Sequence, residues 1–163
     1  MTSDEFAARA HALRGRLFRT AALYLGSEAL ALDAVDEAIY RGLCAAGRLR
    51  RPEYFDTWLT RILLNECARE KKRQARLHPL DDLPETAAPQ QLDALPLKEA
   101  LRRLPEPLLQ VVALRYFAGY TLAETAAILH IPQGTVSTRQ RRALALLRLE
   151  LQSAPQPEKE ETP

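Results

Sequence analysis

The 163-residue chain is poor in the residues from which catalytic and metal sites are built. Its three histidines, His11, His78 and His130, are scattered, and its two cysteines, Cys44 and Cys67, have neither a C-x-x-C pairing nor a histidine at ligand spacing. The sequence contains no Ser/His/Asp set, phosphate-binding loop or metal cluster. We therefore predict that the protein is not an enzyme, needs no cofactor and binds no metal. Both thiols are expected to be reduced and packed on helices.

Long apolar runs and a strong net charge are also missing. Because no run of roughly 18 apolar residues occurs and the start has no basic-then-apolar signal, we predict a cytoplasmic protein that does not insert into a membrane. The formal net charge is only +2, so any affinity for nucleic acid must come from local patches. With 47% hydrophobic residues, the chain has enough apolar surface to form real cores.

Apolar residues recur at helical spacing along most of the sequence, and this periodicity predicts an all-α fold. Thr2 and Glu5 form a capping box before the first helix. Gly26 is expected to end that helix, and Ser27 can cap the second. A third helix is expected to begin at Pro52, a residue suited to the first turn. The expected packed stripes are Phe6, Ala10, Leu13, Leu17, Ala21 and Tyr24 in the first helix, Leu32, Val35, Ile39 and Leu43 in the second, and Phe55, Leu59, Ile62, Leu63 and Cys67 in the third.

The composition changes between residues 78 and 96. This segment is rich in proline, and its acidic residues are accompanied by no lysine or arginine. Such a composition predicts a linker that joins two small helical domains. We assign residues 1–77 to an N-terminal helical bundle, 78–96 to the Pro-rich acidic linker, 97–152 to a C-terminal helical domain and 153–163 to a disordered tail.

The stretch 120–151 predicts two helices separated by a short break. Thr121 and Glu124 form a second capping box at the start of the first of them. The break falls at His130-Ile131-Pro132, where histidine tolerates a positive φ and proline suits a first helical turn. The second helix is expected to begin near Gln133 and to run to about residue 151. The pattern is that of a helix–turn–helix.

Winding that second helix at 100° per residue gives it two faces. One face is expected to pack inward and carries Val136, Gln140, Ala143, Leu144 and Leu147. The other carries Gly134, Thr138, Arg141, Arg142 and Ala145, with Thr135 nearby and Ser137 and Arg139 on the flanks, and no acidic residue precedes Glu150. Arginines, small hydroxyl residues and a helix N-terminus suit the major groove of DNA. A merely solvated basic face is the alternative interpretation.

Two more surfaces of the N-terminal domain carry a functional pattern. The third helix combines Tyr54, Trp58, Arg61 and Asn65 with a strongly basic end, and such residues can stack on unpaired bases and hold a phosphate backbone. The alternative is that its aromatic residues are core and its basic end favours the helix dipole. The second helix displays Asp33, Asp36, Glu37 and Arg41, an acidic patch that becomes functional if a partner offers a basic helix.

Three segments, in this order, resemble the extracytoplasmic-function group of bacterial RNA polymerase sigma factors. LDAVDEAIYR, residues 32–41, is similar to the helix that binds core polymerase in that family. YFDTWLTRILLN, residues 54–65, is similar to the helix that reads the −10 promoter element. Residues 101–129, followed by IPQGTVSTR at 131–139, are similar to the domain that reads the −35 element. His130 stands where the family commonly has glycine, and Gln140 where it commonly has an apolar residue.

The resemblance implies a sigma factor whose partners are core RNA polymerase, promoter DNA and an anti-sigma factor. The expected polymerase-binding residues are Asp33, Asp36, Glu37, Tyr40 and Arg41. The expected −10 contacts are Arg48, Arg51, Tyr54, Trp58, Arg61 and Asn65. The expected −35 contacts are Gln133, Gly134, Thr135, Ser137, Thr138, Arg139, Arg141 and Arg142.

Two other functions fit the same helices. A free-standing transcriptional regulator would use the helix–turn–helix alone, and such proteins generally dimerise to match their half-sites. No separate dimerisation helix follows Leu151 in the sequence. A helical adaptor would bind only proteins, and its basic faces would simply be solvated. Promoter footprinting without polymerase and salt-dependent DNA binding distinguish these alternatives.

Overall fold

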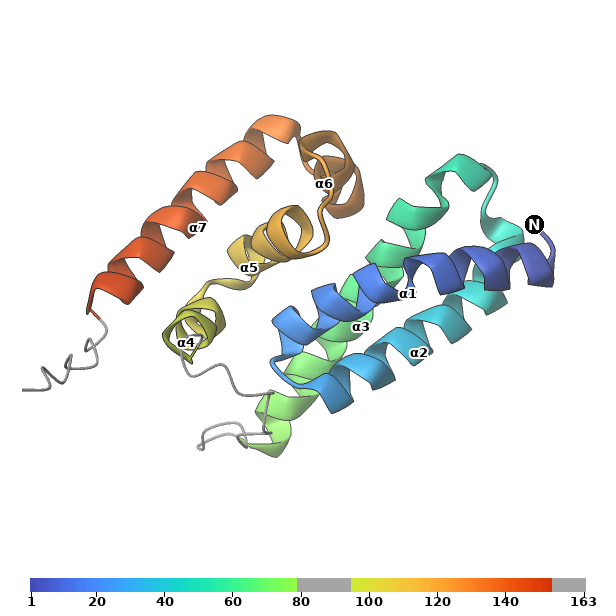
Figure 1. Cartoon of the computed structure of the whole chain (residues 1–163). Helices are drawn as coiled ribbons and strands as arrows, with labels where there is room; N and C mark the ends of the chain where they lie inside the picture. Colours follow the sequence, from blue (N-terminus) through green and yellow to red (C-terminus); the bar gives the residue numbers. More distant parts are fainter. Residues whose placement is uncertain (79–94, 154–163) are drawn as a thin grey trace, which may run out of the picture.

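The computed structural model describes residues 1–78 and 95–153, and every regular element in these ranges is helical (Figure 1). The prediction of an all-α fold is therefore confirmed. The N-terminal domain contains α1 (Ser3–Leu25), α2 (Glu28–Ala45), the 3₁₀ turns η1 (Ala46–Arg48) and η2 (Pro52–Tyr54), and α3 (Phe55–Leu77). The C-terminal domain contains α4 (Leu95–Arg103), α5 (Glu106–Val112), the π-helical turn η4 (Ala113–Phe117), α6 (Leu122–Leu129) and α7 (Gln133–Ser153).

Most of the predicted linker, residues 79–94, lies outside the described residues, as does the tail from residue 154. Leu95 already belongs to α4, and Ser153 is the last residue of α7. In the part of the chain that the structure describes, no helix is both long and apolar enough to cross a membrane.

Local capping fixes where the N-terminal helices begin and end. The Thr2 hydroxyl accepts a hydrogen bond from the Glu5 amide at 3.1 Å, and the Glu5 carboxylate accepts one from the Thr2 amide at 2.9 Å. Gly26 ends α1 in the left-handed conformation, with φ +67°. The Ser27 hydroxyl then accepts from the Leu30 amide and starts α2. The predicted stripe of α1 is completely buried.

The packed stripe predicted for α2 was partly wrong. Leu32 and Leu43 are 46% and 45% exposed, and the buried face is formed by small residues, namely Ala31, Ala34, Val35, Ala38 and Gly42. The reason is the close approach of the three helices. A Cβ on Gly42 would lie 2.7 Å from Leu59 Cδ1 and 3.1 Å from the Phe6 ring. Leu32 and Leu43 are therefore displayed outward, whereas Val35 is buried as predicted and Ile39 is half-buried against the core.

The other expected stripes are largely confirmed. In α3, Phe55, Leu59, Leu63 and Cys67 are buried, and Ile62 is half-buried. Burial raises the pKa of the Cys67 thiol to about 12. Cys44 is exposed on α2, so the prediction that both thiols are packed was wrong for this one.

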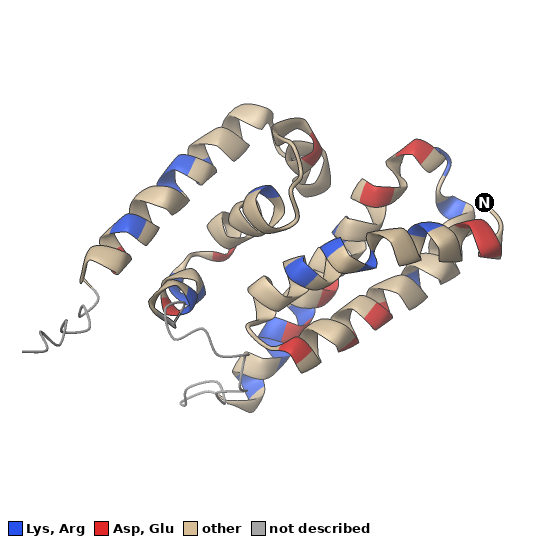
Figure 2. Cartoon of the chain, viewed as in Figure 1, with Lys and Arg blue, Asp and Glu red and all other residues tan. Residues whose placement is uncertain are grey.

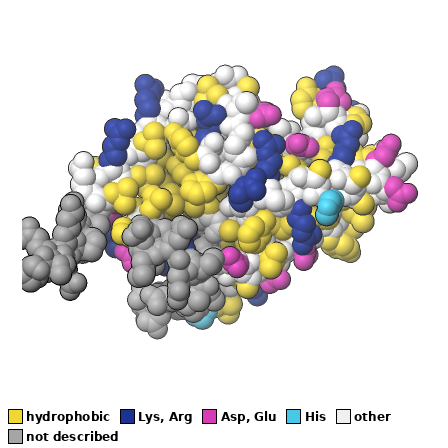
Figure 3. Space-filling model, viewed as in Figure 1, with side chains coloured by type: hydrophobic (Ala, Val, Ile, Leu, Met, Phe, Trp, Pro, Cys, Tyr) yellow, Lys and Arg dark blue, Asp and Glu magenta, His cyan; other side chains and the backbone are white. Residues whose placement is uncertain are grey.

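The two domains pack against each other and share one buried cluster. The cluster runs from Phe6 and Leu17 in α1 to Leu114, Tyr120 and Ile128 in the C-terminal domain. α1 contacts η4, and α3 contacts α6. In the face drawn in Figure 3, hydrophobic side chains also gather where α5 lies beside α4 and α7 (Figures 1 and 3). The described residues thus form one continuous body.

Candidate nucleic-acid interface

The N-terminus of α6 is fixed by the predicted capping box. The Thr121 hydroxyl accepts from the Glu124 amide at 3.1 Å, and the Glu124 carboxylate accepts from the Thr121 amide at 2.7 Å. These bonds satisfy two backbone donors that would otherwise lack a partner at the helix start. The first helix of the helix–turn–helix therefore begins where the sequence indicates.

His130 turns the chain between α6 and α7. It has the left-handed conformation, with φ +55°, and it is the only non-glycine residue with positive φ among the described residues. The Ala126 carbonyl accepts from the amides of both His130 and Ile131 and so closes the end of α6. The Pro132 carbonyl accepts from the Thr135 amide and starts α7. At this break, histidine therefore occupies the left-handed position that glycine most readily adopts.

α7 has the two faces predicted from its periodicity. Val136, Ala143 and Leu147 are buried, while Gln140 and Leu144 are half-buried. The outward face is accessible, and basic residues mark it along the helix (Figure 2). Among the predicted DNA contacts, Gln133, Gly134, Thr138, Arg141 and Arg142 are exposed, and Thr135, Ser137 and Arg139 are half-exposed. The structure therefore brings all eight onto or beside one exposed surface.

Gln140 has a partner that the sequence did not reveal. Its amide oxygen accepts from Arg115 Nε at 3.1 Å, and Arg115 Nη1 also donates to the Tyr120 carbonyl at 2.8 Å. Gln140 thereby ties α7 to Arg115 in the π turn, and Arg115 continues the contact to Tyr120. A polar residue on the packed stripe of α7 is tolerated because this hydrogen bond satisfies its oxygen.

The predicted −10 residues lie on η1, on η2 and on one side of α3. Arg48, Arg51 and Tyr54 are exposed around the turn before α3. Trp58 and Asn65 project from the same side of α3, where a spacing of seven residues brings side chains into register. Asn65 is exposed, whereas Trp58 is half-buried, and its ring lies 6.0 Å from that of Phe55. Trp58 therefore both packs on the core and reaches the surface.

Arg61 belongs to the same predicted group but is engaged within the chain. Its Nε donates to the Ile128 carbonyl at 2.9 Å, and its Nη2 donates to the Ala127 carbonyl at 2.5 Å. Burial lowers the pKa of the Arg61 guanidinium from its ordinary value. Within residues 1–78 and 95–153, no comparable hydrogen bond to another helix holds the side chains of the other members of the group.

The acidic residues of α2 are partly paired within the chain. Asp36 accepts from Arg14 Nη2 at 2.8 Å, and Glu37 accepts from Arg41 Nε at 2.6 Å. Asp33 and Tyr40 are exposed, Tyr40 by 64%. The sequence did not identify Arg14 as a partner, because that contact joins residues 22 positions apart.

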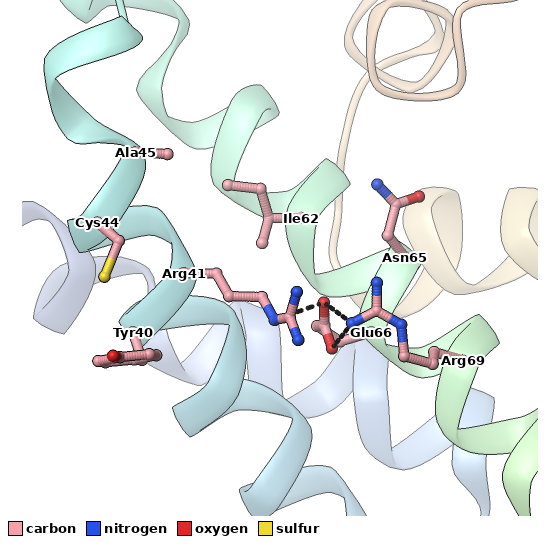
Figure 4. Close-up of a pocket in the computed structure, with 8 residues that line it drawn as sticks. All are labelled: Tyr40, Arg41, Cys44, Ala45, Ile62, Asn65, Glu66 and Arg69. Carbon is pink, nitrogen blue, oxygen red and sulfur yellow. Dashed lines mark hydrogen bonds and ion pairs between the residues drawn. The ribbon is translucent and has the colours of Figure 1, made fainter.

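An open hollow of about 330 Å³ lies beside this surface, between α2 and α3 (Figure 4). Glu66, only 8% exposed, forms an ion pair with Arg41 at 3.0 Å and another with Arg69 at 3.1 Å. Sequence reasoning did not identify Glu66 as the residue that connects Arg41 of α2 with Arg69 of α3. The available signal was a carboxylate next to Cys67, on the packed side of α3.

Comparison with known proteins identifies the chain. The family model for sigma-70 region 2 matches residues 10–77, and the model for sigma-70 region 4 matches residues 100–149. RNA polymerase sigma factor SigV of Bacillus subtilis is 32% identical over 139 residues, which cover 82% of this chain and 83% of the relative. The chain belongs to the sigma-70 family. It is therefore a transcription initiation factor.

A second relative places the chain in the extracytoplasmic-function (ECF) group of the family. The ECF RNA polymerase sigma factor SigM of Mycobacterium tuberculosis is 34% identical over 137 residues, covering 81% of this chain and 69% of the relative. Sigma factors direct promoter-specific transcription initiation and are not enzymes, so both of these predictions are confirmed by the family.

Solved structures of sigma factors share the fold. The sigma factor RpoE from Bartonella quintana, in complex with the anti-sigma factor NepR, has a TM-score of 0.74 and 20% sequence identity, covering 93% of this chain and 99% of that chain. CnrH, in complex with the cytosolic domain of CnrY, has a TM-score of 0.74 and 22% identity, covering 94% and 92%. At these identities the likeness concerns the fold alone.

Proposed function

We propose that this sigma factor binds core RNA polymerase through α2, reads the −35 element with α7 and holds unpaired −10 bases with α3 and the turn before it. The observation that carries the proposal is the outward face of α7. Arg141 and Arg142 are exposed there, and no acidic side chain precedes Glu150. Such a helix, entering the major groove with its N-terminus, has donors for guanine edges and for phosphates.

The acidic surface of α2 is the proposed polymerase contact. Asp33, Asp36, Glu37 and Tyr40 form an exposed or half-exposed strip on one helix, and complementary charge favours a basic helical partner. Arg41 belongs to the strip as the residue that orients Glu37 and contacts Glu66. Each domain alone would bind DNA weakly, and attachment to the same polymerase makes the pair bivalent.

The proposed function also implies a cellular location and a further partner. A factor that works on the polymerase of the cell acts in the cytoplasm, and we place this chain there. The fold shared with RpoE bound to NepR and with CnrH bound to CnrY supports an anti-sigma protein as a further partner. Co-expression with a candidate inhibitor encoded nearby, followed by co-purification, tests that partner.

Run-off transcription from a promoter library tests the main proposal. Core polymerase is incubated with the library in the presence and absence of this protein, and the transcripts are sequenced. We expect a defined set of promoters that share a −35 and a −10 sequence only when the protein is present. Footprints on promoter DNA without polymerase would favour the free-standing regulator. Absence of salt-dependent DNA binding even with polymerase would favour the protein-binding adaptor.

A further inference from the structure

The turn between α2 and α3 relies on contacts from outside itself. Arg48, Arg51 and Tyr54, which we propose for the −10 contact, lie on it and are exposed. Neither of its 3₁₀ turns, η1 and η2, has a capping side chain. The Leu49 amide donates to the Ala46 carbonyl at 3.2 Å, and the Tyr54 amide donates to the Arg51 carbonyl at 3.1 Å. Because such short 3₁₀ turns have poor hydrogen-bond geometry, the position of this segment must be set by the rest of the domain.

Arg9 of α1 makes a contact of this kind. The N-terminal half of α1, dark blue in Figure 1, passes beside the turn. From there Arg9 Nη1 donates to the Pro52 carbonyl at 2.6 Å, across 43 positions of the sequence. The Arg9 guanidinium also lies 5.8 Å from the centre of the Phe55 ring. One side chain thus contacts both η2 and the first residue of α3.

Arg9 projects from a helix that is itself fixed against its neighbours. Phe6, one helical turn before Arg9, packs edge-on against Phe55 with ring centres 5.4 Å apart, and both residues are 1% exposed. A Cβ on Gly42 of α2 would lie 3.1 Å from the Phe6 ring, so α1 and α2 are also in close contact here. Leu49 packs against the same core from within the turn. The turn is therefore anchored to the core at Leu49 and to α1 by Arg9.

We propose that Arg9 is a positioning residue for the −10 contact. On the basis of the function proposed above, Arg9 acts through the turn and keeps its exposed side chains in place before the unpaired −10 strand binds. A segment that becomes ordered only on binding loses conformational freedom, and this loss weakens the complex. A hydrogen bond from a charged donor is about twice as strong as a neutral one, so the Arg9 guanidinium is suited to hold the turn in advance.

Arg9→Gln is the variant that tests this role, and Arg102→Gln is its matched control. Both remove one positive charge from an exposed position of a helix. Arg102 lies on α4 and belongs to none of the proposed contact sets. Because glutamine is a good helix former, both variants should fold, and circular dichroism checks their helix content.

Trypsin digestion of the free chain measures whether the turn is ordered. Trypsin cleaves after arginine unless proline follows, so the bonds after Arg48 and Arg50 report on the turn. Cleavage follows the population of the locally open segment. We expect Arg9→Gln to be cut at these two bonds about tenfold faster than the wild type, because a hydrogen bond from a charged group is lost. Arg102→Gln should be cut there at the wild-type rate, and cleavage elsewhere in the chain is the reference for global unfolding.

The −10 preference is the second measurement, made with core polymerase and forked DNA from a promoter selected in the transcription experiment. One fork carries the selected −10 bases in its single strand, and the other carries a scrambled strand. For Arg9→Gln we expect the affinity for the selected fork to fall about tenfold and the affinity for the scrambled fork to stay unchanged. Arg102→Gln should bind both forks like the wild type. Loss of a direct phosphate contact would instead weaken both forks alike and flatten the salt dependence by about one unit of slope.

Three results would overturn the positioning role of Arg9. Wild-type cleavage of Arg9→Gln in the turn would show that the turn is ordered without this side chain. A loosened turn with an unchanged −10 preference would show that its order does not affect reading. Equal weakening on both forks would make Arg9 a phosphate contact. If no promoter is selected at all, the proposed function fails, whereas trypsin digestion still decides whether Arg9 holds the turn.

Discussion

Arg142 is the residue at which base readout and phosphate binding can be separated. It is exposed on α7, away from the buried stripe. If it makes a bidentate contact with a base edge, Arg142→Ala will cost about 1–3 kcal/mol of binding free energy and relax the preference at one base of the −35 element. Selection of −35 variants by the wild type and the mutant measures this. An unchanged preferred sequence, with a salt dependence flatter by about one unit of slope, would make Arg142 a phosphate contact.

His130 carries backbone strain at the break before α7. A left-handed conformation costs an ordinary residue about 1–2 kcal/mol, and a β-branched side chain makes it worse. We expect His130→Val to lower the free energy of unfolding by about 1 kcal/mol and His130→Gly to leave it equal or higher. Urea unfolding curves with equal slopes give both values. Equal stability of the valine and glycine variants would mean that the turn can change its conformation.

At the scale of the element, α2 is tested by charge reversal. Asp36→Lys/Glu37→Lys should abolish co-purification with core polymerase, because it inverts the exposed acidic strip. The reversal also breaks the pairs with Arg14 and Arg41, so circular dichroism must show that helix content is unchanged. Glu53→Lys/Glu99→Lys makes the same change in net charge at exposed positions outside α2 and should keep binding. Survival of core binding in the first variant would remove α2 from the interface.

The exposed side of α3 is tested by promoter melting. Trp58→Ala and Asn65→Ala should impair open-complex formation on duplex promoters more than on templates already melted at the −10 element. Contacts to unpaired bases contribute about 1–3 kcal/mol per base, and only once the strands separate. Permanganate footprinting of the two templates measures the difference. Because Trp58 is half-buried against Phe55, equal defects on both templates would show that its loss unfolds the domain.

The elements also show what sequence reasoning could reach. Capping boxes, the helix–turn–helix and the faces of α7 follow from local rules, and Thr121, His130 and Val136 took the predicted places. The predicted stripe of α2 was partly wrong, because Gly42 and the alanines pack closely against the neighbouring helices. Periodicity alone cannot show that a small residue is buried while a larger residue beside it is exposed. The hydrogen bonds that Arg16, Arg19 and Arg61 donate to carbonyls of the C-terminal domain were beyond prediction, because every residue has a backbone carbonyl.

At the scale of the whole molecule, the shared core predicts cooperative unfolding. Trp58 is the single tryptophan and reports on the N-terminal domain, whereas helix content reports on both domains. We expect tryptophan fluorescence and circular dichroism to follow one coincident urea transition in the wild type. In Arg16→Gln/Arg19→Gln the two curves should separate, because this variant removes the hydrogen bonds that α1 donates to the Ala118 and Phe117 carbonyls and weakens the contact between the domains. Separate transitions in the wild type would contradict the shared core.

The hydrogen bonds from Arg16 and Arg61 to carbonyls of the C-terminal domain also have a consequence for the order of synthesis. The N-terminal domain leaves the ribosome with Arg16 and Arg61 already in place, but the carbonyls of residues 117–119 and 127–128 are made later. The roughly 50 residues between the ends of α3 and α6 take about 3–10 s at about 5–20 residues per second. During those seconds the nascent chain presents these arginines without their carbonyl partners to any nucleic acid nearby, and the rate of translation sets how long they stay exposed.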